Sequence, residues 1–277
     1  MLTSREPLQN QRSALMKTPT LAVALIVKNE AAQLRQCLNS VADWVDEIVI
    51  LDSGSTDDTL TIAQSFQARI FTHTDWQGFG RQRQIAQSHV HSDWILWLDA
   101  DERVTPALRA SIQQQLANPA ANTVFAIPRL SWAFGRFIRH SGWYPGYVIR
   151  LYPTALTTYD DALVHEKVKL PEGVSIKRLQ GDLLHYTYRD VSQYLSKMAH
   201  YTCLWAQQRQ ERGKRTSIFA AVGHAFATFV KMYLIKAGFL DGRQGFILAV
   251  AHAYATFAKY ADLWIRTQTQ GPDEYEQ

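Results

Sequence analysis

The stretch LAVALIV at residues 21–27 opens a series of short apolar runs, which continues with EIVILD at 47–52 and WILWLD at 94–99. Two further runs, ARIFTH at 68–73 and VFAIP at 124–128, have the same character. A continuously apolar run of this length is typical of a strand that is covered on both faces of a parallel sheet. Helical patterns lie between the runs, and this alternation predicts an α/β fold.

Helix signals support this interpretation. Apolar spacing predicts helices over 31–42 and 55–66, and Ser55 with Asp58 three residues later is a possible capping box for the second helix. Thr105 followed by Pro106 predicts the start of another helix, because proline at the first helical position loses no needed hydrogen bond. After about residue 130, aromatic residues and glycines predict irregular strands and loops around a pocket.

The chain divides into three parts by composition. Residues 1–19 form a polar leader without the apolar stretch of a signal peptide, residues 20–200 carry the α/β pattern, and residues 201–277 are helical. Within the last part, apolar helices are expected at 217–237 and 243–265, with glycines suited to a turn between them. The sequence predicts a mostly parallel central sheet flanked by helices, followed by a C-terminal helical extension.

Composition excludes several classes of protein. Of the 277 residues, 47% are hydrophobic and 19% are charged, which excludes a disordered chain, a collagen-like repeat or a long coiled coil. The net charge of +4 is compatible with a phosphate-bearing substrate, an anionic membrane or a nucleic acid. Cys37 and Cys203 lack the spacing of a zinc site or a disulfide framework, so a cytoplasmic setting is expected.

The C-terminal part carries a strong positive charge beside its apolar helices. Residues Cys203–Arg243 contain seven Lys or Arg and two acidic residues. This combination favours an anionic membrane surface, on the inner face of the cytoplasmic membrane, over nucleic acid, for which no motif is present. Packing on the α/β domain or on a dimer partner is the alternative. The longest uncharged windows, Thr216–Val230 and Gly245–Ala258, are too short to span a bilayer.

Acidic segments follow three of the expected strands. These are KNE at 28–30, DSGSTDD at 52–58 and DAD at 99–101. Open parallel sheets place their ligand crevice at the carboxyl ends of the strands, so the three segments should meet there. Their mutual repulsion becomes tolerable when a divalent cation lies between the carboxylates and a polyphosphate completes its oxygen shell. The pattern predicts a Mg²⁺ or Mn²⁺ site that binds a nucleotide; a solvated cluster at a helix start is the alternative.

The motifs KNE, ILDSGSTDDT and WLDADE, in this order and spacing, resemble those of the family-two inverting nucleotide-sugar glycosyltransferases, which have the GT-A fold. The resemblance covers roughly residues 20–200. It implies that Asp52, with Ser53 beside it, contacts the uracil or ribose of the donor. It also implies that Lys28, Asn29 and Glu30 line the base pocket and that the DxD motif holds the metal and the diphosphate.

A narrower resemblance extends over almost the whole chain. GFGRQRQIA, SGWYPGYVIRLYP, VHEKV and KAGFLDGRQGF look like the bacterial lipopolysaccharide-core glycosyltransferases, which implies transfer of glucose from UDP-glucose to a glycolipid or lipopolysaccharide-core acceptor. Arg81, Arg83 and Arg150 are candidate phosphate contacts. Gln84 departs from the pattern, which has Asn at that position, and the role of its segment is open.

Displacing a nucleotide diphosphate needs a Lewis acid on the leaving group. Asp99 and Asp101 are the candidate metal ligands, with Asp101 also assigned to the catalytic set. GT-A enzymes often use a late histidine as well, and the resemblance assigns that role to His185. A packed core histidine is the equally weighted alternative.

The acceptor hydroxyl needs a general base. Glu166 is the first candidate, although it could instead pair with Lys167 or Arg150. Asp160 and Asp161 are the alternatives, and His165 is expected to be a packed or pocket-wall residue.

Aromatic residues Trp143, Tyr144 and Tyr147 are either core or a platform for the acceptor sugar. Two other functions remain open. A sugar-nucleotide nucleotidyltransferase would usually have a glycine-rich phosphate loop after the first strand, where this chain has VKNEA. A non-catalytic membrane-binding or saccharide-binding relative would fold but show no turnover.

Overall fold

The computed structural model describes residues 18–161 and 166–268. Almost all of the leader expected at 1–19, and the whole of His165, lie outside the described residues. The described strands are β1 Leu21–Val27, β2 Glu47–Asp52, β3 Arg69–Thr72, β4 Trp94–Trp97, β5 Glu102–Val104, β6 Thr123–Ala133, β7 Arg136–Phe137, β8 Gly146–Pro153, β9 Ser175–Arg178 and β10 Leu183–Tyr188. The helices are α1 Ala31–Asn39, α2 Thr59–Ser65, α3 Phe79–Ser88, α4 Pro106–Ala117, α5 Val191–Glu211, α6 Ile218–Val230 with a π-helical continuation Lys231–Ile235, a 3₁₀ turn Gly238–Asp241, and α7 Gly242–Gln268.

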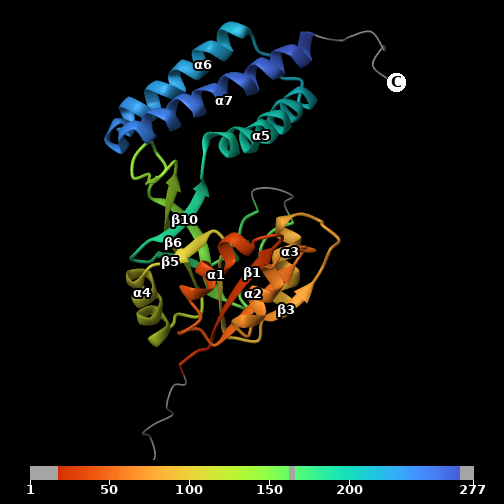
Figure 1. Cartoon of the computed structure of the whole chain (residues 1–277), viewed down its shortest axis with the longest axis vertical. Coiled ribbons are helices and arrows are strands. Elements are labelled where there is room, and N and C mark those ends of the chain that lie inside the picture. Colours follow the sequence, from red (N-terminus) through yellow and green to blue (C-terminus); the bar gives the residue numbers. More distant parts are fainter. Residues whose placement is uncertain (1–17, 162–165, 269–277) are drawn as a thin grey trace, which may run out of the picture.

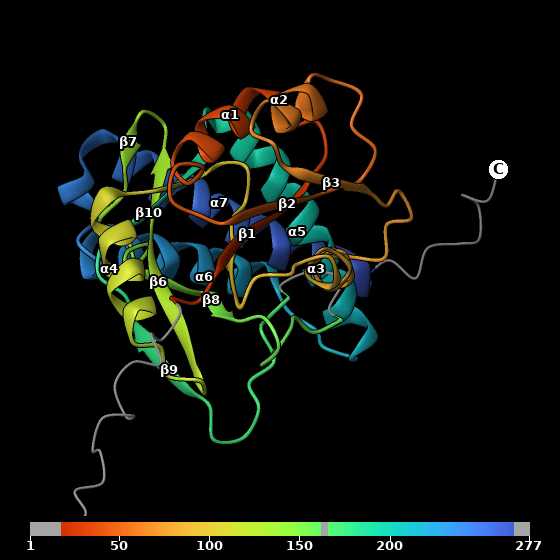
Figure 2. The ribbon, with the colours of Figure 1, turned by 90° about the horizontal axis from the view of Figure 1, so that it is seen from below.

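The N-terminal half is a parallel sheet in the order β3-β2-β1-β4. Side chains of β1 alternate between two cores: Val23 and Leu25 pack with α1, α2 and α4, whereas Ala22 and Ala24 pack with α3. Figure 2 shows α1 and α2 on one side of these strands and α3 on the other. Burial on both faces explains why β1, β4 and the centre of β2 are continuously apolar, whereas the edge strand β3 is only partly buried. The α/β fold predicted from these runs is confirmed.

The second half of the sheet mixes directions. Strand β8 lies antiparallel between β4 and β6, β10 runs parallel to β6, and β5 pairs antiparallel with β10 at the edge. The mostly parallel sheet that the sequence predicts is confirmed: β3-β2-β1-β4 pair in parallel, as do β6-β10 and β6-β9, while β8, β7 and β5 add antiparallel pairs. Strand β5 follows the DxD segment directly and pairs with β10, with Glu102 opposite His185, and this brings His185 beside the motif.

Two of the helix signals can be compared with the structure. Thr105 caps α4 as expected, since its hydroxyl accepts the N–H of Leu108 at 3.3 Å. The capping box at Ser55 is wrong: α2 begins at Thr59, with Asp58 at the N-cap position and no side-chain cap. Ser55 instead accepts the N–H of Asn29 at 3.0 Å, because the loop after β2 bonds to the loop after β1.

Helices α5, α6 and α7 form a layer beyond one end of the sheet (Figure 1). Asp190 caps α5 by accepting the N–H of Gln193 at 2.8 Å, so the helical part begins there and the expected boundary at residue 200 falls inside α5. The layer is joined to the sheet by a small apolar core that includes Tyr188 from β10, Tyr194 from α5 and Leu248 from α7.

One helix is longer than the uncharged windows indicated. The π-helical turn continues α6 through Lys231, giving 18 residues, Ile218–Ile235, with mean hydropathy 1.6 and 11% of them buried. By length and composition this helix can cross a membrane, which corrects the expectation from the sequence that no segment is long enough. The sequence windows stopped at Lys231, although a single lysine does not end an apolar helix.

Candidate active site

The loops after β1 and β2 are bound to each other. The Asn29 side chain accepts the N–H of Thr56 at 2.8 Å, and the N–H of Glu30 donates to Thr59 Oγ1 at 2.8 Å. Asn29 has φ 56°, a left-handed conformation that asparagine tolerates better than most residues. Lys28 is exposed at the same edge. The KNE and DSGSTDD segments thus form one continuous loop surface at the carboxyl ends of two neighbouring strands.

Asp52 is 2% exposed at the end of β2. Its carboxylate accepts the N–H groups of Gly54 and Ser55, each at 3.0 Å, so it fixes the loop that follows it. Ser53 is 5% exposed, and its hydroxyl has no hydrogen-bond partner among the described residues. Asp52 therefore shapes the loop surface, and Ser53 retains a free polar group there.

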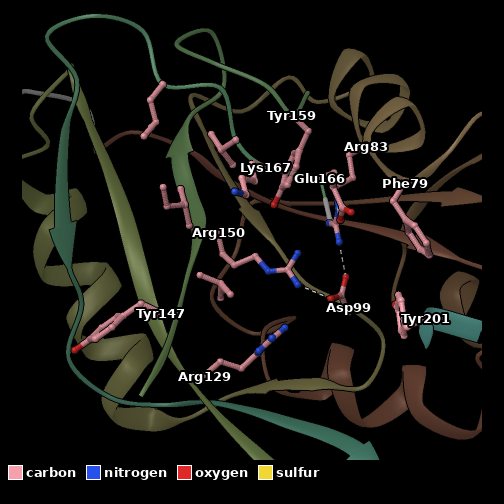
Figure 3. A pocket seen from close by; sticks show the side chains of 14 residues that line it. Phe79, Arg83, Asp99, Arg129, Tyr147, Arg150, Tyr159, Glu166, Lys167 and Tyr201 are labelled. Carbon is pink, nitrogen blue, oxygen red and sulfur yellow. Dashed lines mark hydrogen bonds and ion pairs between the residues drawn. The ribbon is translucent and has the colours of Figure 1, made fainter. Parts of the chain in front are cut away.

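Asp99, the first acid of the DxD motif, is held by two arginines (Figure 3). Arg83 from α3 donates to Oδ1 at 2.6 Å, and Arg150 from β8 donates to Oδ2. Burial alone would raise the pKa of Asp99, but Arg150 and Arg83 outweigh it and hold that pKa well below its usual range. Both oxygens of this carboxylate are therefore engaged by the protein.

Glu102 completes this network and was not singled out from the sequence. It is fully buried, accepts the N–H of Asp99 at 2.9 Å and lies 3.3 Å from the guanidinium of Arg150. A buried carboxylate needs such partners, because an unpaired charge there would be strongly destabilising. Glu102 follows the DxD motif directly, and this position is the one sequence signal that could have identified it.

Asp101, the second acid, lies against His185 from β10. The distance from Asp101 Oδ2 to His185 Nε2 is 3.3 Å, and the other ring nitrogen lies 2.6 Å from the hydroxyl of Thr187. A carboxylate oxygen and an imidazole nitrogen at this separation fit two neighbouring positions around Mg²⁺ or Mn²⁺. No group of three or more possible ligand residues is found within 18–161 and 166–268, so the pair would need substrate oxygens and water to complete a coordination shell.

Glu30 connects the first loop with the DxD motif. Burial, then the charges of Asp101, Asp99 and Asp57, raise its pKa from 4.5 to about 7. The three acidic segments therefore act on one another electrostatically, as expected for segments that meet at one edge of the sheet. Their repulsion makes this edge a favourable place for a cation.

Glu166 lies on the far side of Arg83 from Asp99. Its Oε1 is 3.2 Å from Arg83 Nε, and its side chain is 16% exposed. The guanidinium of Arg83 also stacks over the rings of Trp97 and Tyr159, at 5.0 and 4.9 Å from their centroids. Arg83 thus fixes Glu166 and Asp99 relative to each other.

The other sequence candidates lie elsewhere. Arg81 donates to Gln84 at 3.1 Å and lines a separate cavity with Asp161. Arg81 and Arg83 are two positions apart on α3, so their side chains point to different faces of the helix. Gln84 donates to the carbonyl of Tyr159 at 2.9 Å and to Asp161 at 2.7 Å, which gives this departure from the family pattern a loop-holding role. Asp160 accepts the N–H of Lys167 at 3.1 Å within the same loop. The structure thus separates Arg81 from Arg83 and Asp161 from Glu166, whereas Asp160 is bonded to Lys167, the residue next to Glu166.

Two cavities meet at Asp99. The first, of about 680 Å³, is lined by Phe79, Arg83, Asp99, Arg129, Tyr147, Val148, Ile149, Arg150, Tyr159, Glu166, Lys167, Val168, Leu170 and Tyr201. The second, of about 850 Å³, is lined by Asp99, Arg129, Ser131, Trp143, His185, Thr187, Tyr188, Lys197, Met198, Tyr201, Thr202, Leu204, Trp205, Gln208, His252, Ala255, Thr256 and Lys259. Tyr147 and Trp143 line one cavity each, whereas Tyr144 donates to Asp182 at 2.8 Å. The DxD motif therefore lies between two compartments.

Several known proteins are similar in sequence to this chain. Residues 22–167 match the family described as Glycosyl transferase family 2. The lipopolysaccharide core biosynthesis glycosyltransferase LpsC of Rhizobium meliloti is 30% identical over 82% of this chain and 85% of its own length. An uncharacterized glycosyltransferase of Rickettsia felis is 28% identical over 82% of this chain and 83% of its own length.

Solved structures also match part of the chain. A glucosyl-3-phosphoglycerate synthase from Mycobacterium tuberculosis, solved with Mn²⁺ and UDP, is 24% identical with a TM-score of 0.34. The match covers 42% of this chain and 44% of the synthase, which is less than half of either protein. The relatives matched over most of the chain carry the assignment, and they favour sugar transfer over nucleotidyl transfer and over a non-catalytic role. This chain is a glycosyltransferase and belongs to glycosyl transferase family 2.

Proposed function

We propose that the protein is a metal-dependent, inverting hexosyltransferase that moves glucose from UDP-glucose onto a lipopolysaccharide core or a similar glycolipid. The observation that carries this proposal is the position of Asp99 on the border of two cavities. A transfer between two bound molecules needs adjoining compartments that meet where the bond is exchanged. The match to LpsC over most of both chains supports the class of acceptor.

Asp101 and His185 would hold the cation, Mg²⁺ or Mn²⁺. When bound, the cation would stabilise the negative charge that develops on the departing diphosphate. Arg83 and Arg150 each keep a buried guanidinium N–H without a partner among the described residues, in addition to the donors that bind Asp99. These N–H groups are suited to oxygens of the donor, since charged donors bind such oxygens strongly. Asp99 itself acts by fixing the two arginines.

Glu166 would be the general base. Its carboxylate takes the proton of the acceptor hydroxyl while the hydroxyl oxygen bonds to the anomeric carbon and the bond from that carbon to the diphosphate breaks. Attack from the face opposite the leaving group inverts the anomeric configuration. Arg83 supports this role because it holds Glu166 and Asp99 on one guanidinium, which places the base close to the border between the cavities.

The nucleoside of the donor would bind on the joined loops after β1 and β2, which line neither of the two cavities, and its diphosphate and sugar would extend from there into the first cavity at Asp99. Lys28, Asn29 and Glu30 supply one side of this surface, and Asp52 with Ser53 supplies the other. The unpartnered Ser53 hydroxyl is suited to a polar group of the nucleotide. Arg81 is not part of this proposal, because it lines a different cavity.

The helical layer would bind the inner face of the cytoplasmic membrane. Phe219, Val222 and Phe226 on α6 are 84%, 55% and 69% exposed at a spacing of three and four residues. Phe246, Val250 and Tyr254 on the neighbouring α7 are 47%, 44% and 60% exposed at a spacing of four. Basic residues accompany these apolar faces, among them Lys231, Lys236 and Arg243. An apolar face with cations beside it matches an anionic bilayer, where the acceptor lipid would also reside.

The test is nucleotide release from UDP-, ADP- and GDP-sugars, with deacylated lipopolysaccharide core as acceptor and Mn²⁺, Mg²⁺ or a chelator. UDP should be released from UDP-glucose only with metal and acceptor. Asp101→Asn and His185→Ala should each lower the rate at least about 100-fold, the usual scale for loss of charge stabilisation at a leaving group. Asp43→Asn, at a side chain 66% exposed on the surface, is the control and should keep the rate.

Glu166→Gln separates the base from the donor site. It should retain binding of UDP and Mn²⁺ and lose transfer by about 100-fold or more. Transfer at the wild-type rate by this variant would disprove the assignment of the base. Transfer that is unaffected by a chelator, or by both Asp101→Asn and His185→Ala, would disprove the metal site.

A further inference from the structure

The second cavity runs from the DxD motif to the helical layer. Asp99 and His185 lie at its inner end. Its outer walls come from two helices, with residues between Lys197 and Gln208 of α5 and between His252 and Lys259 of α7. The helical layer therefore forms part of the wall of a cavity that reaches the DxD motif.

Three cations line this cavity, against one carboxylate. They are Arg129, Lys197 and Lys259, and the carboxylate is Asp99, which Arg83 and Arg150 already engage. Arg129 lies 3.7 Å from Glu102. Within the part of the chain that the structure describes, neither lysine forms an ion pair; Lys197 lies over the ring of Tyr188 at 5.5 Å.

The helices offer the two lysines no acid of their own. Residues 191–268 contain ten Lys or Arg and three acidic residues. All three acids have other hydrogen-bond donors: Asp241 accepts the N–H of His140 at 2.9 Å, Asp262 pairs with Arg266 at 3.0 Å, and Glu211 accepts from Gln207 at 3.2 Å. The positive charge of the cavity is thus left uncompensated by the helices that carry it.

Lys259 is the most constrained of these cations. Its Nζ lies 5.1 Å from the ring centroid of Trp205 and 5.6 Å from that of Tyr260, while Arg209 lies 5.0 Å from Trp205 on the same indole. Burial, and then the charge of Arg209, lower the pKa of Lys259. A second cation close by is unfavourable unless an anion joins them, because like charges in a partly buried place repel. Tyr201 and Trp205 add aromatic faces on which a sugar ring can stack.

We propose that the second cavity is the acceptor site and that it recognises an anionic saccharide, with Lys197 and Lys259 binding a phosphate or carboxylate group of the acceptor. The sugar beside that group stacks on Tyr201 or Trp205, and the hydroxyl to be glycosylated points toward Asp99. Lys197 and Lys259 are specificity residues: they touch the acceptor and take no part in bond exchange. This inference rests on the proposed transfer to a saccharide acceptor, but it concerns binding and can be tested without turnover.

The experiment is calorimetric titration of the full chain with deacylated lipopolysaccharide core oligosaccharide in three forms: intact, dephosphorylated, and carboxyl-reduced. Wild type should bind the intact form, and the form that loses the recognised group should bind at least about tenfold more weakly, the scale of one charged hydrogen bond. Lys197→Gln and Lys259→Gln should each weaken binding of the intact form by a similar factor and leave the weaker form unchanged. Lys177→Gln on β9, an exposed lysine outside both cavities, is the matched control.

Lys197 is exposed, so its replacement tests the cavity without disturbing packing, and it covers the case in which Lys259→Gln fails to fold. Equal affinity of wild type for all three oligosaccharides, absence of binding, or wild-type affinity in the Lys197→Gln variant would overturn the inference. Binding with the expected charge dependence, but without transfer from any sugar nucleotide, would refute the proposed function and leave the anionic site standing. Loss of affinity in Lys177→Gln as well would show a general charge effect and would also overturn the inference.

Discussion

Arg150 should be the most sensitive residue of the buried ion network. It is 6% exposed and its guanidinium serves both Asp99 and the fully buried Glu102. Removing one member of a buried ion pair costs about 3–5 kcal/mol, because the remaining charge stays buried without its partner. Asp99 is one-third exposed and can recover some hydration, so we expect Arg150→Met to cost about 3 kcal/mol, at the lower end of that range.

Arg109→Met is the matched control. Arg109 pairs with Asp43 at 2.7 Å, but the two side chains are 37% and 66% exposed. A surface pair of this kind contributes about 0–1 kcal/mol. The same substitution in the same protein therefore separates the buried network from the general effect of losing an arginine.

The assay is thermal unfolding followed by circular dichroism at pH 7. A loss of about 3 kcal/mol corresponds to roughly 6–12 °C in the unfolding midpoint of a chain this size. The difference in unfolding midpoint between wild type and Arg150→Met should shrink as the pH falls below about 4. Because the pKa of Asp99 is lowered in the folded state, its contribution to stability is complete above the unfolded pKa and is lost gradually as the pH falls toward the folded pKa. Equal midpoints for Arg150→Met and Arg109→Met would refute the account of the network.

Two other changes probe the backbone and the acidic edge. Gly181→Ala should destabilise the fold strongly, because a Cβ there would lie 2.3 Å from the backbone nitrogen of Leu108. Gly173 has a similar positive φ but open space around it, so Gly173→Ala should destabilise the fold far less. Similar unfolding midpoints for the two variants would contradict the prediction. In the metal-free protein, Glu30→Gln should reduce the change in folding stability between about pH 5 and 8. The pKa of Glu30 is raised to about 7, so in the wild type the folded state loses stability as rising pH ionises this carboxyl. Mn²⁺ should narrow the difference in pH-dependent stability between Glu30→Gln and wild type. If the stability of the two metal-free proteins changed with pH in parallel, the prediction would be contradicted.

The sequence predicted the parallel half of the fold well because its strands are buried on both faces. A run such as LAVALIV has one simple physical cause, and β1 occupies Leu21–Val27 as expected. In the mixed half, only VFAIP at 124–128, which lies in β6, carried such a signal. Apart from the hairpin with β7, strand β6 pairs with β8, β9 and β10, and partners so distant in the chain leave no periodic pattern.

The candidate site shows the same division. The positions of the acidic segments after their strands predicted where the DxD motif lies, and the family resemblance alone assigned His185 to it. The partners of Asp99 depend on tertiary geometry. Arg83 and Arg150 approach it from α3 and β8, and short-range patterns contain no information on that contact. Arg81 and Arg83 could have been told apart from the sequence if a helix at 79–88 had been predicted, since positions two apart face different ways.

Helix α7 would link the proposed membrane contact to the proposed acceptor site, because its two faces have different environments. His252 and Lys259, seven residues apart, line the second cavity, while Phe246, Val250 and Tyr254 are exposed. A lipid-linked acceptor could therefore keep its lipid in the bilayer while its saccharide reaches the cavity from the same helix.

This arrangement makes a prediction about α6, whose exposed apolar residues line neither of the two cavities. Replacing Phe219 and Phe226 by Glu should abolish flotation with anionic liposomes and lower transfer to a liposome-bound acceptor at least about tenfold, since each buried aromatic contributes roughly 1.5–3 kcal/mol to burial in an apolar phase. Transfer to the soluble, deacylated acceptor should stay at the wild-type rate, because α6 lines neither the first nor the second cavity. Equal losses with both acceptors would mean that α6 supports the fold instead of the membrane contact, and unchanged flotation would mean that another surface binds the bilayer.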